Sequence, residues 1–383
     1  MAERMEARVS TGIGAHFREL PDPRRETMNG RHKFLDILVI AICGAICGAN
    51  DWVAVAAFGR AKENWLRAFL ELPNGIPSHD TFGDVFSKID PDRFRKCFIS
   101  WVESLADILP GDVVAIDGKT SRHSYDRGDS RSPIHMVSAW ASRSSLVLGQ
   151  VKTEDKSNEI SAIPRLLEIL ELTGCLVTID AMGCQKEIAR KIREKGADYL
   201  LALKENHPKL HESVVARFDA ARDGGFESRE MDFAETEDRN HGRIEYRRCR
   251  VESDISWLER KDEWKDLASV AMIESERHLD GRFSIERRYY LSSAKLEASE
   301  FLERARRHWS IENSLHWVLD IAFREDDSRI RKGNGAENFA ILRHIAINLL
   351  RRDKTAKMGV KNKRLRAGWD ETYLLKILSG IFR

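Results

Sequence analysis

The chain has 383 residues, which is long enough for two or three domains and a large hydrophobic core. Charged residues make up 32% of the sequence, but the formal net charge is only +2, so global charge does not single out a nucleic-acid partner. The six cysteines form no CxxC pair, which argues against a zinc site or a disulfide-stapled fold, and the charged N-terminus has no apolar signal core. We therefore expect reduced thiols in a cytoplasmic protein.

Residues 1–108 are predicted to form an N-terminal helical domain, which is a candidate for DNA binding. The apolar stretch 37–49 is too short to span a bilayer, so we expect it to be a buried helix. Ser78 and Asp90 are predicted to be N-caps of two short helices. Helices across 78–100 are compatible with a helix-turn-helix, although any small helical bundle has the same pattern.

Residues 109–205 change character and are predicted to form the first part of a catalytic core. Apolar, β-rich runs alternate with two amphipathic helical patterns, in the order β-β-β-α-β-α-β. Three antiparallel strands followed by two right-handed crossovers give an α/β fold, a mixed sheet with flanking helices. This is the order of a ribonuclease-H-like fold, in which the first and fourth strands are neighbours at the centre of the sheet.

Two aspartates follow apolar runs in this core. Asp117 is predicted to end the first strand in "VVAIDGK", and Asp180 to end the fourth in "CLVTIDAMG". Either one alone is often only a turn former. If the two strands are neighbours, the carboxylates lie side by side, repel each other and need a cation between them. Hard oxygen ligands favour Mg²⁺ or Mn²⁺, and a two-metal site needs a further acid, for which Glu312 in "RRHWSIENSLHW" is the best candidate.

The remaining chain is expected to form two further parts. Residues 206–295 are strongly charged with short alternating runs, which predicts a β-rich insertion. Residues 296–383 are predicted to hold a long catalytic helix bearing Glu312, followed by a basic helical C-terminal part. The block 351–366 is rich in Lys and Arg, and it is either a solvated surface or a phosphate-binding arm.

Long motifs give the chain a resemblance to a known family. "AIDGKT", "SNEISAIPRLLEIL", "VTIDAMGCQKEIA", "DYLLALKENHP", "NHGRIEYR" and "HWSIENSLHWVLDIAFREDDSRIRKGNGAENFAILRHIAINLL" resemble the H-repeat-associated (Rhs-element-linked) branch of bacterial insertion-sequence DDE transposases. The N-terminal "HFRELPDPRR" and "IPSHDTFGDVF" are similar to that branch too, so the resemblance covers nearly the whole chain.

The resemblance implies a DDE triad of Asp117, Asp180 and Glu312, which would be both the catalytic and the metal-binding residues. It implies metal-assisted hydrolysis of a phosphodiester at a transposon end, after which the freed 3′-hydroxyl attacks target DNA. The cofactor would be Mg²⁺ or Mn²⁺, with two ions expected. The partners would be the terminal inverted repeats and target DNA, with a homodimer on DNA as one option, and no membrane.

One departure from the family concerns phosphate binding. Broader relatives carry a Tyr, an Arg and a Lys around the Glu, where this chain has Ala305, His308 and Leu319. Other side chains are therefore candidates for contacting DNA: Lys119, Lys204, Arg243, Arg247, Arg307, His308, His316, Arg329, Arg331 and Lys332.

His308, Glu312 and His316 are spaced four apart and are expected on one side of a helix. A zinc site is disfavoured, because the two histidines would be roughly 12 Å apart along the helix axis. The histidines either pack the helix or donate hydrogen bonds to phosphates beside Glu312. Two functional alternatives also stay open: a stand-alone metal-dependent nuclease on the same fold, and a DNA-binding protein whose catalytic site has decayed.

Overall fold

The computed structural model describes residues 13–24, 31–105, 110–125, 132–153, 159–224, 231–240, 242–279 and 282–379. Its N-terminal part is helical, as the sequence predicts. The helices are α2 (Ile13–Phe17), α3 (Phe34–Ile46), α4 (Trp52–Ala61), α5 (Glu63–Leu66), α6 (His79–Lys88) and α7 (Pro91–Glu103). The side chains of Ser78 and Asp90 accept hydrogen bonds from backbone N–H groups of α6 and α7, respectively. Both predicted N-caps are therefore present.

The most apolar stretch forms α3, which is buried over most of its length. Within the described ranges, no helix has both the length and the hydropathy that crossing a bilayer requires. The six cysteines are free thiols that are buried or partly buried.

The centre of the molecule is the predicted mixed sheet. Its elements are β1 (Val113–Thr120), β2 (His135–Ala141), β3 (Leu146–Lys152), α8 (Glu159–Ile169), β4 (Leu176–Ile179), α9 (Lys186–Glu194) and β5 (Asp198–Leu203). β1 runs antiparallel to β2 and parallel to β4, and β4 runs parallel to β5. The core is thus ribonuclease-H-like, with the first and fourth strands adjacent.

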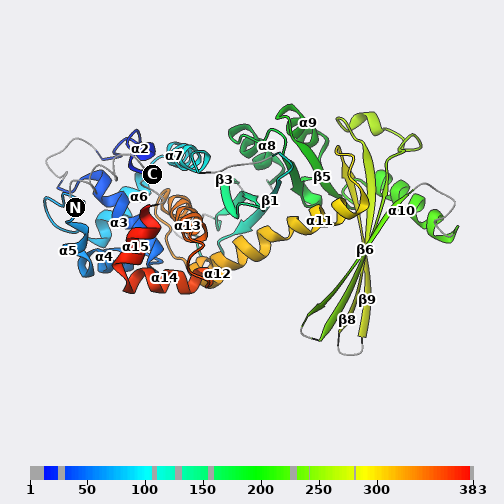
Figure 1. The fold of residues 1–383 in the computed structure, drawn as a ribbon. Coiled ribbons are helices and arrows are strands. Elements are labelled where there is room, and N and C mark those ends of the chain that lie inside the picture. Colours follow the sequence, from blue (N-terminus) through cyan, green and yellow to red (C-terminus); the bar gives the residue numbers. More distant parts are fainter. Residues whose placement is uncertain are drawn as a thin grey trace.

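The insertion does not form a separate sheet. After α10 (Pro208–Asp223) come β6 (Asp232–Asn240), β7 (Arg243–Glu252), β8 (Ser269–Leu279) and β9 (Arg282–Ser292). β9 pairs with β5, so all the strands belong to one nine-stranded sheet in the order β3-β2-β1-β4-β5-β9-β8-β7-β6. Two long hairpins therefore extend from the ribonuclease-H-like core as a continuation of its own sheet (Figure 1).

A long helical segment then returns across the sheet. It consists of α11 (Ala298–His308), a π-helical turn at Glu312–His316 and α12 (Trp317–Phe323). α11 contacts β1, β4, β6 and β7, whereas α8 contacts β2 and β3 and α9 contacts β5. In Figure 1, α11 joins the hairpin end of the molecule to its helical end.

The C-terminal helices α13 (Gly335–Arg352), α14 (Val360–Trp369) and α15 (Glu371–Ser379) pack with the N-terminal helices (Figure 1). α13 contacts α3, α6 and α7 on one side and β3 on the other. Its Asn348 side chain bonds both the N–H and the C=O of Val147, with distances of 2.8 and 2.9 Å. α13 therefore fixes the helical part of the chain to β3, at the edge of the sheet.

Candidate active site

The register of β1 and β4 brings two candidate acids together. Ile116 pairs with Ile179 in the parallel ladder, and Asp117 and Asp180 are the next residues of the two strands. Asp180 follows the last residue of β4 and accepts a hydrogen bond from the Ala181 N–H at 2.6 Å. The acids thus emerge as neighbours from the buried centre of the sheet.

The prediction that the first strand ends at Asp117 is wrong. β1 continues to Thr120, because the residues after Ile116 keep their antiparallel pairing with β2 although β4 has ended. Asp117 therefore lies inside a strand, opposite Ser138, and its backbone is held by the ladder. A carboxylate on a paired strand is more rigidly mounted than one in a turn.

Asp117 is in an unusual electrostatic environment. Its pKa is raised to about 7, chiefly by burial and also by the charges of Glu159, Glu312 and Asp180, while a hydrogen bond from the Gly118 N–H acts in the opposite direction. Its Oδ2 lies 3.5 Å from His316 Nδ1. An acid surrounded by like charges favours either a proton or a bound cation.

Glu312 is the third acid of this cluster. It begins the π-helical turn that interrupts the long helix, and its side chain is exposed. Burial and the charge of Asp180 raise the pKa of Glu312, and Arg288 of β9 lowers it. π turns are rare and are frequently found at functional sites.

The donor set fits Mg²⁺ or Mn²⁺, since it consists of carboxylate oxygens that repel one another. The acids are not preassembled as a cage. Nowhere in the described ranges do three or more His, Cys, Asp or Glu side chains gather closely enough to hold a metal ion. The side chains of Asp117, Asp180 and Glu312 would therefore have to move for all three carboxylates to coordinate metal ions.

A further acid beside Asp117 was not predicted from the sequence. Glu159 of α8 accepts a hydrogen bond from His135 Nε2 at 2.6 Å, and His135 Nδ1 is hydrogen-bonded to Thr120 Oγ1 at 2.7 Å. The pair lies against the Cα of Gly118, where a Cβ would come within 2.4 Å of both Glu159 Oε1 and His135 Nε2. The glycine after Asp117 was the available sequence signal, because close approach of side chains to a backbone requires glycine.

Comparisons with known proteins identify the family. Residues 109–349 match the model of the transposase DDE domain, and residues 14–102 match a model described as DDE_Tnp_1-associated. The chain belongs to the DDE transposase family. It is 42% identical to the H repeat-associated putative transposase YhhI of Escherichia coli (strain K12), covering 95% of this chain and 97% of the relative. It is 43% identical to the putative transposase YncI of Escherichia coli O157:H7, over 94% and 92% of the two chains. These matches place it in the H-repeat-associated branch.

Several basic residues of this transposase that are predicted to contact DNA form ion pairs with acidic side chains in the structure. Lys119 is 10% exposed and pairs with Asp320 at 2.7 Å and Asp326 at 3.3 Å, with Glu325 at 3.6 Å. Burial lowers the pKa of Lys119, but these three carboxylates outweigh burial and raise it. Lys119 thus links β1 to the segment 320–326, and its contact with DNA stays a prediction.

Three further candidates for DNA contacts, two in the insertion and one on α11, also form ion pairs with acids. Arg243 and Arg247 both bind Glu245, which is 3% exposed, and Arg247 also bonds Asp238. Arg307 pairs with Glu303 one turn earlier on α11. In contrast, Lys204 is 60% exposed and its Nζ lies 3.6 Å from Asp180 Oδ1. Of these four cations, Lys204 is the one best placed to meet a substrate at the acids.

The two histidines flanking Glu312 both reach the sheet. His308 Nδ1 is hydrogen-bonded to Thr178 Oγ1 of β4 at 3.0 Å, and His316 lies beside Asp117 of β1. Burial lowers the pKa of both rings, to about 3 for His316, so both are neutral at pH 7. Neutral rings that contact the sheet fit helix packing better than phosphate binding.

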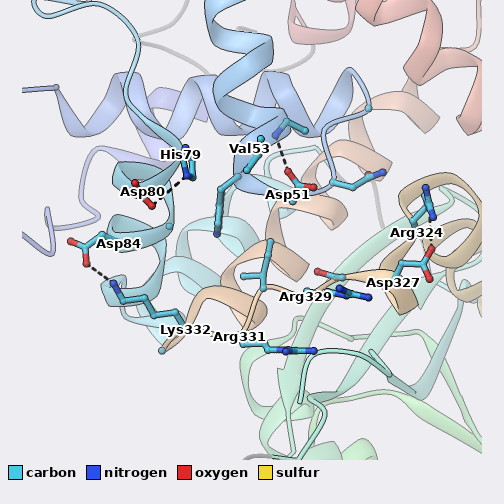
Figure 2. Close-up of a pocket in the computed structure, with 18 residues that line it drawn as sticks. Asp51, Val53, His79, Asp80, Asp84, Arg324, Asp327, Arg329, Arg331 and Lys332 are labelled. Atoms are coloured by element: carbon cyan, nitrogen blue, oxygen red, sulfur yellow. Dashed lines mark hydrogen bonds and ion pairs between the residues drawn. The ribbon is translucent and has the colours of Figure 1, made fainter. Parts of the chain in front are cut away.

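Three further candidates line a groove of about 1100 Å³ between the N-terminal helices and segment 324–333. Figure 2 shows Arg329, Arg331 and Lys332 along one side of this groove, across from Asp51 and Val53 near the start of α4. Lys332 Nζ pairs with Asp84 at 3.1 Å, and the Arg331 guanidinium lies 4.8 Å from the centre of the Tyr125 ring. This groove lies between the N-terminal helices and the segment that follows α12.

The basic residues of block 351–366 that lie on α14 differ in burial. Lys361 and Arg366 of α14 are exposed, whereas Lys363 and Arg364 are buried. Lys363 Nζ donates to the Leu350 C=O at 2.9 Å, and the Arg364 guanidinium donates to the Ala45 C=O at 2.8 and 3.1 Å. For the two buried residues, neither the solvated surface nor the phosphate-binding arm holds, because both side chains bond backbone carbonyls.

Proposed function

We propose that this transposase cuts DNA strands at insertion-sequence ends in a metal-dependent reaction and transfers the freed ends to target DNA. The observation that carries the proposal is the β1–β4 register, which makes Asp117 and Asp180 neighbours. The charge of Glu312 acts on Asp117, which supports a common site for all three acids.

Asp117, Asp180 and Glu312 would hold Mg²⁺ or Mn²⁺, and we expect two ions. When bound, the ions would stabilise the attacking and leaving oxygens of in-line displacements at phosphorus. The chain itself contributes the mounting of the three carboxylates, on a paired strand, at a strand end and on a π turn. The same site would serve both steps, because hydrolysis leaves the 3′-hydroxyl that attacks the target.

The other parts of the chain would bind and position DNA. Residues 1–108 are the candidate DNA-binding domain, and the groove beside Arg329, Arg331 and Lys332 would take duplex DNA next to the catalytic core. Residues 206–295 would extend the core of 109–205 as an insertion. We propose a homodimer that holds two ends, acting in the cytoplasm, where the DNA of a bacterial cell lies.

The test is a cleavage assay on DNA that carries the inverted repeats flanking the gene. The proposal predicts nicking at the repeat ends that requires Mg²⁺ or Mn²⁺ and yields a 3′-hydroxyl, followed by joining to a target plasmid. Metal-dependent cutting of unrelated DNA at the same rate would indicate a stand-alone nuclease. Specific binding of the repeats without cleavage in either metal would indicate a decayed catalytic site.

A further inference from the structure

Arg288 of β9 lies at a junction between the insertion and the catalytic helix. Its guanidinium carbon is 4.4 Å from the centre of the Trp309 ring, and Trp309 is three residues before Glu312. Its Nε donates to Glu286 Oε1 at 2.8 Å, and its side chain is 29% exposed. Stacking on an aromatic face fixes the plane of the guanidinium while leaving its edge accessible.

Two hollows meet at this arginine. One of about 380 Å³ reaches Glu312, and another of about 200 Å³ reaches Asp180. The residues that line both hollows are Arg288, Tyr290, Ala305 and Trp309. Arg288 is therefore the cation shared by the surfaces that lead to the two acids.

The electrostatics agree with this position. The charge of Arg288 lowers the pKa of Glu312, against the effects of burial and of Asp180, and it also lowers the pKa of His308. Arg288 thus lies close enough to Glu312 of the helix, and to His308 that is bonded to Thr178 of β4, for its charge to act on both. A phosphate bridging the two acids would meet its charge there.

We propose that Arg288 binds the non-bridging oxygens of the scissile phosphate and positions it between Asp180 and Glu312. The inference rests on the proposed function and names a residue that the candidate triad does not include. A planar guanidinium can bind two phosphate oxygens at once, which orients the phosphorus for in-line attack. The insertion would then contribute directly to the active site, because β9 delivers this side chain.

The experiment measures equilibrium binding of end DNA in an Asp117→Asn background, which prevents cleavage. The DNA carries either a normal phosphodiester or an uncharged methylphosphonate at the cleavage position. We expect Arg288→Gln to weaken binding of the phosphodiester DNA by roughly 10- to 100-fold, as for a charged hydrogen bond, and to leave methylphosphonate binding unchanged. Arg288→Lys keeps the charge without the planar fork, and it should fall between Arg288→Gln and the parent protein.

Arg248→Gln is the matched control. Arg248 lies on β7 with 30% exposure, pairs with Glu235 and Glu276, and stacks near Tyr246, but it lines neither hollow. It should bind both DNAs as the parent does. Equal binding by Arg288→Gln and the parent, or an equal loss on both DNAs, would overturn the assignment. If the parent does not prefer end DNA over unrelated DNA, the proposed function fails instead.

Discussion

At the residue scale, the candidate site depends on a position without a side chain. Gly118 follows Asp117 on β1, and the hydrogen-bonded His135–Glu159 pair packs directly against the Cα of Gly118. The register of β1 with β2 fixes the backbone on both sides of this contact. Gly118 therefore lets Asp117 and Glu159 lie near each other without displacing the strand.

We expect Gly118→Ala to disrupt the site. The new Cβ would come 2.4 Å from Glu159 Oε1 and from His135 Nε2, so that either the pair or the strand must move. Overpacking of this kind typically costs about 1–3 kcal/mol of stability. Denaturant unfolding should report that loss, and end cleavage should fall more steeply than DNA binding, because Asp117 would be displaced.

Gly359→Ala is a suitable control for this substitution. Gly359 precedes α14 with φ −66°, and a Cβ there would meet nothing within 4 Å. It should change neither stability nor cleavage appreciably. Cleavage by Gly118→Ala at the rate of Gly359→Ala would refute the importance of the close contact.

At the element scale, strand order was predictable and strand extent was not. Hydrophobic alternation and the connecting helices predict the order of β1 to β5 and hence the neighbouring positions of Asp117 and Asp180. Alternation does not identify a strand's partners, so the sequence did not reveal that β1 continues beyond β4 or that β9 joins β5. Long-range pairing decides both features.

The long helical segment that carries Glu312 shows the same limit of prediction from sequence. Its periodicity predicts a helix, but periodicity does not reveal the π turn at Glu312–His316 or the contacts that the segment makes with the sheet. His308 bonds Thr178 before the turn, and His316 lies beside Asp117 at its end. The candidate acids could thus be chosen from sequence, whereas the partners of the cations could not.

Helix α14 provides a prediction about the basic block. Arg364 donates to Ala45 and Asn50 and its guanidinium lies 3.8 Å from the centre of the Phe323 ring. Burial lowers the pKa of Arg364 to about 9. We expect Arg364→Gln to lower the free energy of unfolding by roughly 3 kcal/mol, because it leaves buried carbonyl groups without donors.

Arg366→Gln tests the exposed side of the same helix. It should leave the free energy of unfolding within about 0.5 kcal/mol of the wild type. If Arg366 contacts a phosphate, the salt dependence of DNA binding should flatten by roughly 0.9 in log–log slope. An unchanged slope for Lys361→Gln together with Arg366→Gln would make this face a solvated surface.

At the scale of the whole molecule, α13 connects the helical part to the sheet and carries a buried titratable group. His344 is 2% exposed, its ring lies near Phe98, and its Nδ1 has no hydrogen-bond partner among the described residues. Burial lowers the pKa of His344, and together with the effects of His316 of the π turn and Arg343 of α13 it brings the value to about 3. Folding therefore requires this histidine to be neutral.

The pH dependence of stability follows from this shift. Above about pH 6.5 the ring is neutral in both the folded and the unfolded chain, so it adds no pH dependence. Below that pH the unfolded chain binds a proton that the folded chain excludes until about pH 3, so folding weakens as pH falls. Relative to wild type, His344→Leu should gain roughly 1.4 kcal/mol for each pH unit across this window. If urea unfolding gave the same difference in unfolding free energy between His344→Leu and the wild type at pH 7 and at pH 5, the prediction would be contradicted.

The central claim is that Asp117, Asp180 and Glu312 act as one metal-dependent centre on DNA. The most direct measurement is Mg²⁺-dependent cleavage of end DNA by Asp117→Asn, Asp180→Asn and Glu312→Gln, beside binding of the same DNA. Glu303→Gln on α11 is the control, because Glu303 is exposed and pairs with Arg307. We predict that each triad variant loses cleavage by at least about 100-fold, an effect of order 2.7 kcal/mol on the barrier, and retains DNA binding, while Glu303→Gln cleaves normally. Cleavage at the wild-type rate by any one of the three triad variants would contradict the claim.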